Sequence, residues 1–170
     1  MRKNLGCNMK KIIFGLLVAI LLIGCSSKEL HIFAEDKPYV EAMRYTKKGD
    51  ILLSLENRAL IIATYLNPLQ KKRDKEYFFV RVYIDNDFED ENRSGLFNPN
   101  YSLTLNDQKP LKIIKVSRDS NLAKKMPFIE PWYHLYVVTF KKSTQKQLKL
   151  IFQNDVAGKA LLVFQNYQAD

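Results

Sequence analysis

The chain has 170 residues, a net charge of +9 and 46% hydrophobic residues, with only six glycines, six prolines and two cysteines. A chain of this length is expected to form one domain and to bury enough surface to fold without disulfides or metals. Its apolar content argues against disorder, and the lack of internal repeats excludes collagen-like and solenoid architectures.

The N-terminal segment has the composition of an export signal. Two pairs of basic residues precede an apolar run over 12–23, which ends at Gly24 and Cys25. A run of this length suits a signal peptide and is shorter than the ~20 residues that a transmembrane helix needs. We therefore expect residues 1–24 to be removed as a signal peptide.

The end of this segment, Leu22-Ile23-Gly24-Cys25, resembles the lipobox of bacterial lipoproteins. The resemblance implies cleavage after Gly24, a diacylglyceryl thioether on the sulfur of Cys25 and a further acyl chain on the new amino group. Two or three acyl chains anchor a protein stably, whereas one chain gives only marginal binding. Membrane lipid, held through this anchor, is therefore the first expected partner, and no other cofactor is expected.

The same resemblance implies a location. Ser26 and Ser27 follow the cysteine, as in lipoproteins that are sorted to an outer membrane, so we expect a lipid-anchored protein of the cell envelope on either its periplasmic or its surface face. Removal of the signal lowers the net charge from +9 to +5, since four basic residues and no acidic residue leave with it. This modest charge and the exported location argue against nucleic acid as a partner.

Residues 25–38 are polar and are predicted to form a tether, and residues 39–170 are predicted to form one domain of short strands. In the segment 76–85, apolar residues from Phe78 to Ile84 recur at every second position, the period of a strand packed on one face. Further runs rich in β-branched and aromatic residues lie at 51–55, 58–66, 101–105, 111–116, 132–140, 147–152 and 159–164.

Turn signals separate these runs. They contain Asn, Asp, Gly or Pro and lie at 48–50, 67–68, 98–100, 106–107 and 154–158. A short helix is indicated only at 121–126, where Pro127 ends it. Seven or eight strands without alternating helices predict an antiparallel β-sandwich. The layout resembles the immunoglobulin-like sandwiches of small bacterial lipoproteins from about Tyr39 to Tyr167, without the disulfide of antibody domains.

An acidic run over 85–92 is the densest group of hard oxygen ligands in the chain. Alternating carboxylates of this kind can bind Ca²⁺ weakly. The four alternating carboxylates are Asp85, Asp87, Glu89 and Glu91. The run does not match an EF-hand, because Asp90 and Leu96 stand where that motif needs glycine and an acid. A solvated loop, a weak cation site and a group of catalytic carboxylates stay open as interpretations.

A short aromatic segment is the preferred binding surface. Two prolines restrict its backbone, and aromatic side chains suit both interfaces and cores; for the aromatic residues of the chain the core role is the favoured interpretation and the binding surface is the alternative. The residues proposed for this surface are Phe128, Ile129, Trp132 and Tyr133.

Recognised catalytic patterns are sparse. With only two histidines, His31 and His134, the chain cannot assemble a His-rich metal site, and the Ser143-x-x-Lys146 pattern lacks the partner motifs of penicillin-interacting enzymes. We therefore assign no catalytic residue. The chain is expected to act by contact with an envelope or host protein or a glycan, either as an assembly accessory or as a surface adhesin. Two alternatives are carriage of a hydrophobic ligand between the sheets and hydrolysis of an envelope polymer by Asp85, Asp87, Glu89 or Glu130.

Overall fold

The computed structural model describes residues 37–72 and 74–167 of the chain. The predicted signal peptide, Cys25 and nearly all of the predicted tether lie outside the described residues. The region from residue 37 onward is a compact unit that carries both hydrophobic clusters and all the strands named below. It therefore has what a domain needs to fold on its own.

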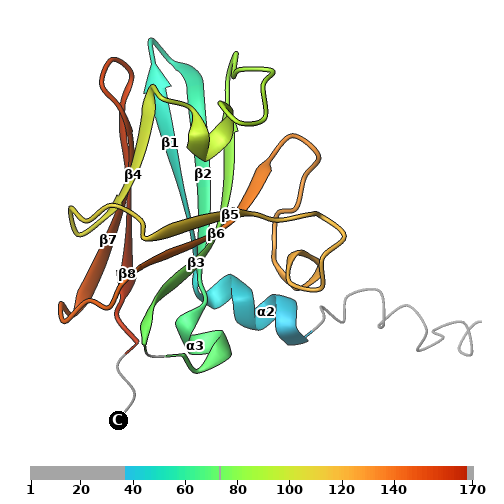
Figure 1. Cartoon of the computed structure of the whole chain (residues 1–170), viewed down its shortest axis with the longest axis vertical. Helices are drawn as coiled ribbons and strands as arrows, with labels where there is room; N and C mark the ends of the chain where they lie inside the picture. Colours follow the sequence, from blue (N-terminus) through green and yellow to red (C-terminus); the bar gives the residue numbers. More distant parts are fainter. Residues whose placement is uncertain (1–36, 73, 168–170) are drawn as a thin grey trace, which may run out of the picture. The chain divides into compact units, whose positions relative to one another are not determined.

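Within this region, eight strands form two sheets, and neighbouring strands pair antiparallel throughout. Sheet A has the order β1-β2-β3-β6-β5, and sheet B has the order β4-β7-β8 (Figure 1). The strands of sheet A are β1 (Thr46–Leu53), β2 (Glu56–Tyr65), β3 (Lys75–Ile84), β5 (Lys112–Lys115) and β6 (His134–Lys141). Those of sheet B are β4 (Tyr101–Leu105), β7 (Gln147–Asn154) and β8 (Gly158–Gln165). The predicted all-β class and antiparallel pairing are confirmed, and each predicted run overlaps one of these strands.

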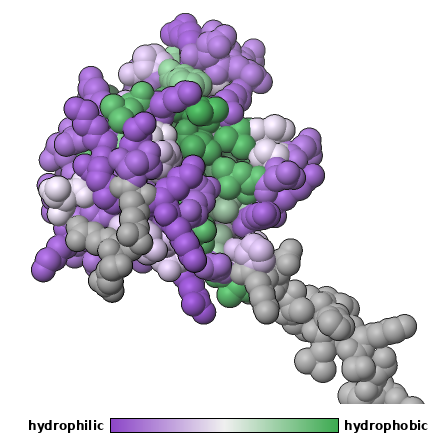
Figure 2. Space-filling view, turned by 60° about the horizontal axis from the view of Figure 1, so that its bottom comes forward, coloured by the Kyte–Doolittle hydropathy of each residue, from purple (hydrophilic) through white to green (hydrophobic). Residues whose placement is uncertain are grey.

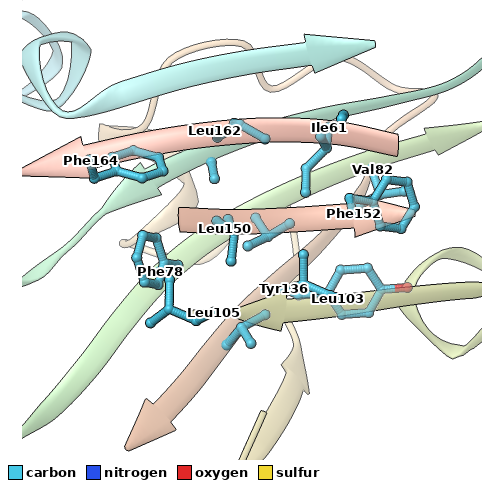
Figure 3. Packing of buried hydrophobic residues seen from close by; sticks show 14 of the residues in the cluster. Ile61, Phe78, Val82, Leu103, Leu105, Tyr136, Leu150, Phe152, Leu162 and Phe164 are labelled. Atoms are coloured by element: carbon cyan, nitrogen blue, oxygen red, sulfur yellow. The ribbon is translucent and has the colours of Figure 1, made fainter. Parts of the chain in front are cut away.

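The main core lies between the two sheets. Alternate residues of β3 point toward sheet B, so Phe78, Val80 and Val82 are fully buried. Phe78 meets Phe164 of β8 edge-on, with ring centroids 5.3 Å apart (Figure 3). Burial of one such side chain stabilises the fold by roughly 1.5–3 kcal/mol. Apolar side chains from β2, β4, β6 and β7 fill the remaining space between the sheets.

A second cluster covers the outer face of sheet A. Its centre is formed by Ile62 of β2, Phe79 of β3 and Leu135 of β6, all of them buried. The helix α2 (Lys37–Arg44) and the segment between β5 and β6 lie over these residues and contribute their own apolar side chains. Sheet A is therefore packed on both faces, which explains why its central strands have few polar positions.

The two short helical elements on this face differ from the sequence expectation. The helix α2 was not predicted; it has only eight residues, and among Pro38–Arg44 only Ala42 is fully buried. The helix predicted at 121–126 is present as a single 3₁₀ turn, η3 (Ala123–Lys125), after which the chain turns extended at Met126.

One predicted turn lies inside a strand. The segment 48–50 belongs to β1, where a Cβ added at Gly49 would lie 3.0 Å from the Cβ of Ala160 in β8. The glycine is there because the two strands approach closely, and the chain does not reverse at this point. It reverses instead at Ser54 and Leu55, both of which have positive φ angles.

Two further short elements complete the domain. The helix α3 (Asn67–Gln70) begins at the predicted turn after β2, with Pro68 in its first turn. A 3₁₀ turn, η2 (Gly95–Phe97), lies between β3 and β4. None of the helices in the described part of the chain is long and apolar enough to cross a membrane.

Candidate functional site

A groove of about 640 Å³ lies where β5 ends and β6 begins. The residues 115–119 form one side of it, the residues 131–135 form the other, and Glu91 closes one end. The two sides are joined by a backbone hydrogen bond in which the N–H of Val116 donates to the carbonyl of Leu135 at 2.8 Å. We call this feature the Trp132 groove, after its most exposed large apolar side chain.

Trp132 is 57% exposed although it is the largest apolar side chain of the segment. Its ring lies 6.2 Å from that of Tyr133, and the two rings are tilted by 49°. The neighbouring Tyr133 is buried in the second cluster, so the backbone below Trp132 is attached to the fold. An exposed indole above a packed neighbour is a rigid platform for another molecule.

The guanidinium of Arg118 holds this segment from the opposite side of the groove. Its Nη2 donates to the carbonyl oxygen of Tyr133 at 2.8 Å and also to that of Pro131. A charged donor makes a hydrogen bond stronger than a neutral one. Arg118 therefore fixes the carbonyl groups of the two residues on either side of Trp132 and limits how far the indole can move.

Charges along the groove are balanced. Lys115 donates to Glu91 with 2.7 Å between Nζ and Oε2, and this contact lowers the pKa of the Glu91 carboxyl. Arg118 and Asp119 add one charge of each sign. A site of this kind offers hydrogen-bond donors and acceptors without a strong preference for either sign of ligand.

His134 lies at the inner end of the groove. Its Nε2 is 3.8 Å from Oδ2 of Asp87, and burial lowers the pKa of the imidazole, with Asp87 partly opposing the shift. The ring is therefore neutral at pH 7 and can both donate and accept a hydrogen bond.

The acidic run is organised by Asp87 beside this end of the groove. Its carboxylate accepts hydrogen bonds from the N–H of Gly95 at 2.6 Å and from the side-chain amide of Asn98 at 2.9 Å. Gly95 has a φ of +60°, and an added Cβ would lie 2.2 Å from the hydroxyl of Tyr136. That hydroxyl donates to the carbonyl of Ser94 at 3.3 Å, so the loop is tied to β6.

The other carboxylates proposed for a cation site have separate partners or none. Asp85 pairs with Arg58 at 2.9 Å, Glu91 pairs with Lys115, and Glu89 is exposed. Across residues 37–72 and 74–167, no group of three or more His, Cys, Asp or Glu side chains is placed to hold a metal ion. The structure thus spreads these carboxylates along the loop and does not gather them at one point.

The four residues of the predicted binding surface have different environments. Trp132 and Tyr133 both line the groove, one exposed and one buried. Phe128 is 42% exposed but does not line the groove, and Ile129 is half-buried against the second cluster. Glu130 is exposed on the same segment, and Cys25 lies outside the described residues.

Sequence reasoning does not identify Lys115, Arg118 and Asp119 as groove residues. Lys115 ends β5, and Arg118 and Asp119 follow it; only the pairing of β5 with β6 brings them beside Trp132. Isolated charged residues after a strand carry no sequence signal of such a role.

Comparison of the chain with protein-family models, with curated proteins and with solved structures found no match.

Proposed function

We propose that this protein is a non-enzymatic, lipid-anchored component of the bacterial cell envelope that binds a protein or a glycan through the Trp132 groove. The observation that carries the proposal is the exposed indole of Trp132 on a backbone that Arg118 holds in place. The lipobox resemblance at Cys25 supports the anchoring and the outer-membrane location.

The composition of the groove supports recognition of another molecule. Trp, Tyr and Arg are the residues that most often dominate binding energy at interfaces, and all three are present here. The balanced charges and the neutral His134 favour a partner that offers hydroxyl, amide or peptide groups over a strongly charged one. Both a glycan and a polar protein surface fit this description.

The finer fold assignment is part of the same proposal. We propose that the two sheets form an immunoglobulin-like sandwich. The antiparallel pairing in both sheets and the core between them support it. Carriage of a hydrophobic ligand between the sheets gains no support, because buried apolar side chains fill that space.

Trp132 gives a direct test, because it is the only tryptophan of the chain. A soluble peptidoglycan fragment or a purified envelope protein that enters the groove is expected to shift the intrinsic tryptophan emission. Trp132→Ala is expected to weaken binding of the same ligand by at least about 30-fold in calorimetry, the effect of a central aromatic contact.

Phe128→Ala is the matched control, because Phe128 is an exposed aromatic on the same segment outside the groove. It is expected to leave binding unchanged. Loss of binding in Phe128→Ala with full binding in Trp132→Ala would move the contact surface away from the groove and overturn its assignment.

Anchoring is tested separately with Cys25→Ala. The wild-type chain is expected to fractionate with membranes and to incorporate a palmitate analogue, and the variant is expected to do neither. Digestion of the domain by protease on intact cells would favour surface adhesion, whereas protection until the cells are permeabilised would favour an assembly role in the periplasm.

A further inference from the structure

Two adjoining hollows lie on the outer face of sheet A, beside the Trp132 groove along β5 and β6. One, of about 340 Å³, lies between α2, α3 and the segment around η3, and the other, of about 560 Å³, lies over β3, β5 and β6. They share Leu66, Gln70 and Leu122 and so form one continuous surface. Figure 2 brings the end of the domain with α2 and α3 forward and shows apolar surface between hydrophilic side chains.

The floor of this surface is apolar and partly open. Leu111 is 51% exposed and Ile114 is 44% exposed, and Val137 lies beside them. Apolar side chains clustered on an otherwise polar surface are typical of a site that contacts a membrane or another protein.

Its rim is basic. Lys72, Lys75 and Lys112 line the second hollow, and Lys125 lines the first, whereas Glu41 is the only acid among the lining residues of either. We call the two hollows with these four lysines the basic face. Lysine side chains around exposed apolar side chains suit a ligand that has an anionic head group and an apolar tail.

Opposite charges occupy the two ends of one strand. β3 begins at Lys75 on the basic face and ends at Ile84, where the acidic run over 85–92 follows. Ten residues of strand separate the two ends by about 30 Å. α2 and α3 lie at the lower end of Figure 1 and the loop after β3 at its upper end. Glu91 of that loop lines the Trp132 groove, so the groove reaches the acidic end.

The chain enters the domain beside the basic face. Pro38 and Glu41 of α2 line the first hollow, and the residues that precede α2 lead back to Cys25. A fully extended chain over 25–36 spans at most about 40 Å, so an acyl group on Cys25 would keep this face close to the bilayer.

We propose that the basic face docks on anionic phospholipid headgroups, with its lysines at the phosphates and its exposed leucine and isoleucine side chains at the acyl boundary. Docking in this way turns the acidic end of β3 away from the bilayer. The orienting role depends on the proposed anchoring at Cys25, whereas the affinity for anionic lipid does not.

The test uses the unlipidated chain from Ser26 to Asp170 and vesicles of phosphatidylcholine with or without phosphatidylglycerol. Sedimentation with vesicles is expected only when phosphatidylglycerol is present, and it is expected to weaken as salt is added. Each lysine near an anionic surface contributes about fivefold in affinity, so Lys72→Gln with Lys125→Gln is expected to lower binding roughly 25-fold.

Lys149→Gln with Lys159→Gln is the charge-matched control, because both lysines are exposed on sheet B. This variant is expected to keep most of the binding. Equal losses in the two double variants, or equal binding to both kinds of vesicle, would overturn the proposal. So would stronger retention by polyglutamate than by vesicles, which would identify an acidic polypeptide as the occupant. A dimer that the Lys72 and Lys125 substitutions dissociate would identify a second copy and would overturn it as well.

Failure of this test leaves the proposed function standing, because ligand binding by the Trp132 groove is measured without lipid. Loss of ligand binding by the Trp132 groove with intact vesicle binding would overturn the proposed function and leave the docking proposal standing.

Discussion

Two charged side chains of β3, Glu76 and Arg81, are both fully buried, but only one of them is surrounded by partners. The carboxylate of Glu76 accepts hydrogen bonds from the hydroxyl of Tyr65 at 2.6 Å and from the amide of Asn67 at 3.0 Å. Its other oxygen accepts from the N–H of Ser143 at 3.0 Å and lies 3.1 Å from Nζ of Lys142. Glu76 therefore joins β3 to the chain after β2 and to the hairpin between β6 and β7.

Arg81 has a poorer set of contacts. Its Nη2 donates to the hydroxyl of Thr64 at 2.6 Å, and its guanidinium lies 5.1 Å from the ring centre of Phe79. Nε and Nη1 are buried without a hydrogen-bond partner, and no ion pair of Arg81 occurs among residues 37–72 and 74–167. Burial lowers the pKa of Arg81 to about 9, which leaves it a cation at neutral pH.

A chain of hydroxyl groups links Arg81 to the helix above it. Thr64 shares a hydrogen bond of 2.7 Å with Thr46, and Thr46 donates to the carbonyl of Ala42 in the last turn of α2. The C-terminal end of a helix carries partial negative charge, which favours a nearby cation. The comparison shows two ways to bury a charge: direct partners hold Glu76, whereas Arg81 relies on one hydroxyl and on a helix end.

The largest expected effect is that of Glu76→Ala. The substitution leaves the N–H of Ser143 without an acceptor and the hydroxyl of Tyr65 with only a long contact of 3.5 Å to Asn166, so we expect a loss of roughly 3–5 kcal/mol in the free energy of unfolding. Urea denaturation followed by circular dichroism measures it. A loss below about 1 kcal/mol would show that water replaces the carboxylate and that Glu76 is not a structural centre.

Thr64→Val is expected to have the next largest effect. It removes the acceptor that the guanidinium of Arg81 uses, at a cost of about 1–3 kcal/mol for a buried charged donor. Addition of Arg81→Met to this variant is expected to restore most of that loss, because no buried cation then remains. Additive losses in the double variant would mean that Thr64 and Arg81 act independently.

Tyr65→Phe tests the Glu76 network through pH. Burial and then the hydrogen bond to Glu76 raise the pKa of Tyr65 above its ordinary value of 10. The unfolded chain ionises this group above pH 10 while the folded chain keeps its proton, so stability falls as the pH rises beyond 10. The variant is expected to lose about 1 kcal/mol at pH 7 and to show a shallower decline above pH 10.

Part of the alkaline decline remains in that variant, because burial also raises the pKa of Tyr136 to about 12. Tyr77→Phe is the comparison variant: the hydrogen bond to Asp74 raises the pKa of Tyr77 too, but this hydroxyl lies at the exposed surface, so a smaller change of the alkaline slope is expected than in Tyr65→Phe. An unchanged alkaline slope in Tyr65→Phe would contradict the assignment.

Arg81→Met is expected to have the smallest effect, within about 1 kcal/mol of the wild type, because a well-packed apolar side chain replaces a cation that has few partners. Thermal unfolding at neutral pH measures the difference. A loss as large as that of Glu76→Ala would erase the contrast between the two sites and would show that Arg81 has a strong partner.

Much of the sheet structure could be predicted from alternation alone. The period of two located β3, but the strand packed on one face that it predicted was wrong, because Phe79 and Arg81 on the other face are also buried, under α2 and the loop over sheet A. Gly49 was misleading because glycine serves both tight turns and close strand contacts, and only the approach of Ala160 distinguishes the two. Local pattern also fails for α2, a helix of only eight residues that packs against the segment around η3 and the second cluster.

The candidate site was predictable only in part. The segment around Trp132 was proposed from its aromatic residues, but alternation does not say which of two neighbours, Trp132 or Tyr133, faces solvent. Arg118 enters the site through the pairing of β5 with β6. The acidic run was visible in the sequence, whereas its division among Arg58, Lys115 and the backbone of Gly95 was not.

The sequence by itself determined the all-β class, the approximate strands and the resemblance to a lipoprotein signal at Cys25, because each depends on neighbouring residues along the chain. Only the tertiary structure decided the Trp132 groove, the basic face and the contrast between Glu76 and Arg81. These features depend on which distant segments meet, and the meeting of two sheets depends on packing and register that no single segment encodes.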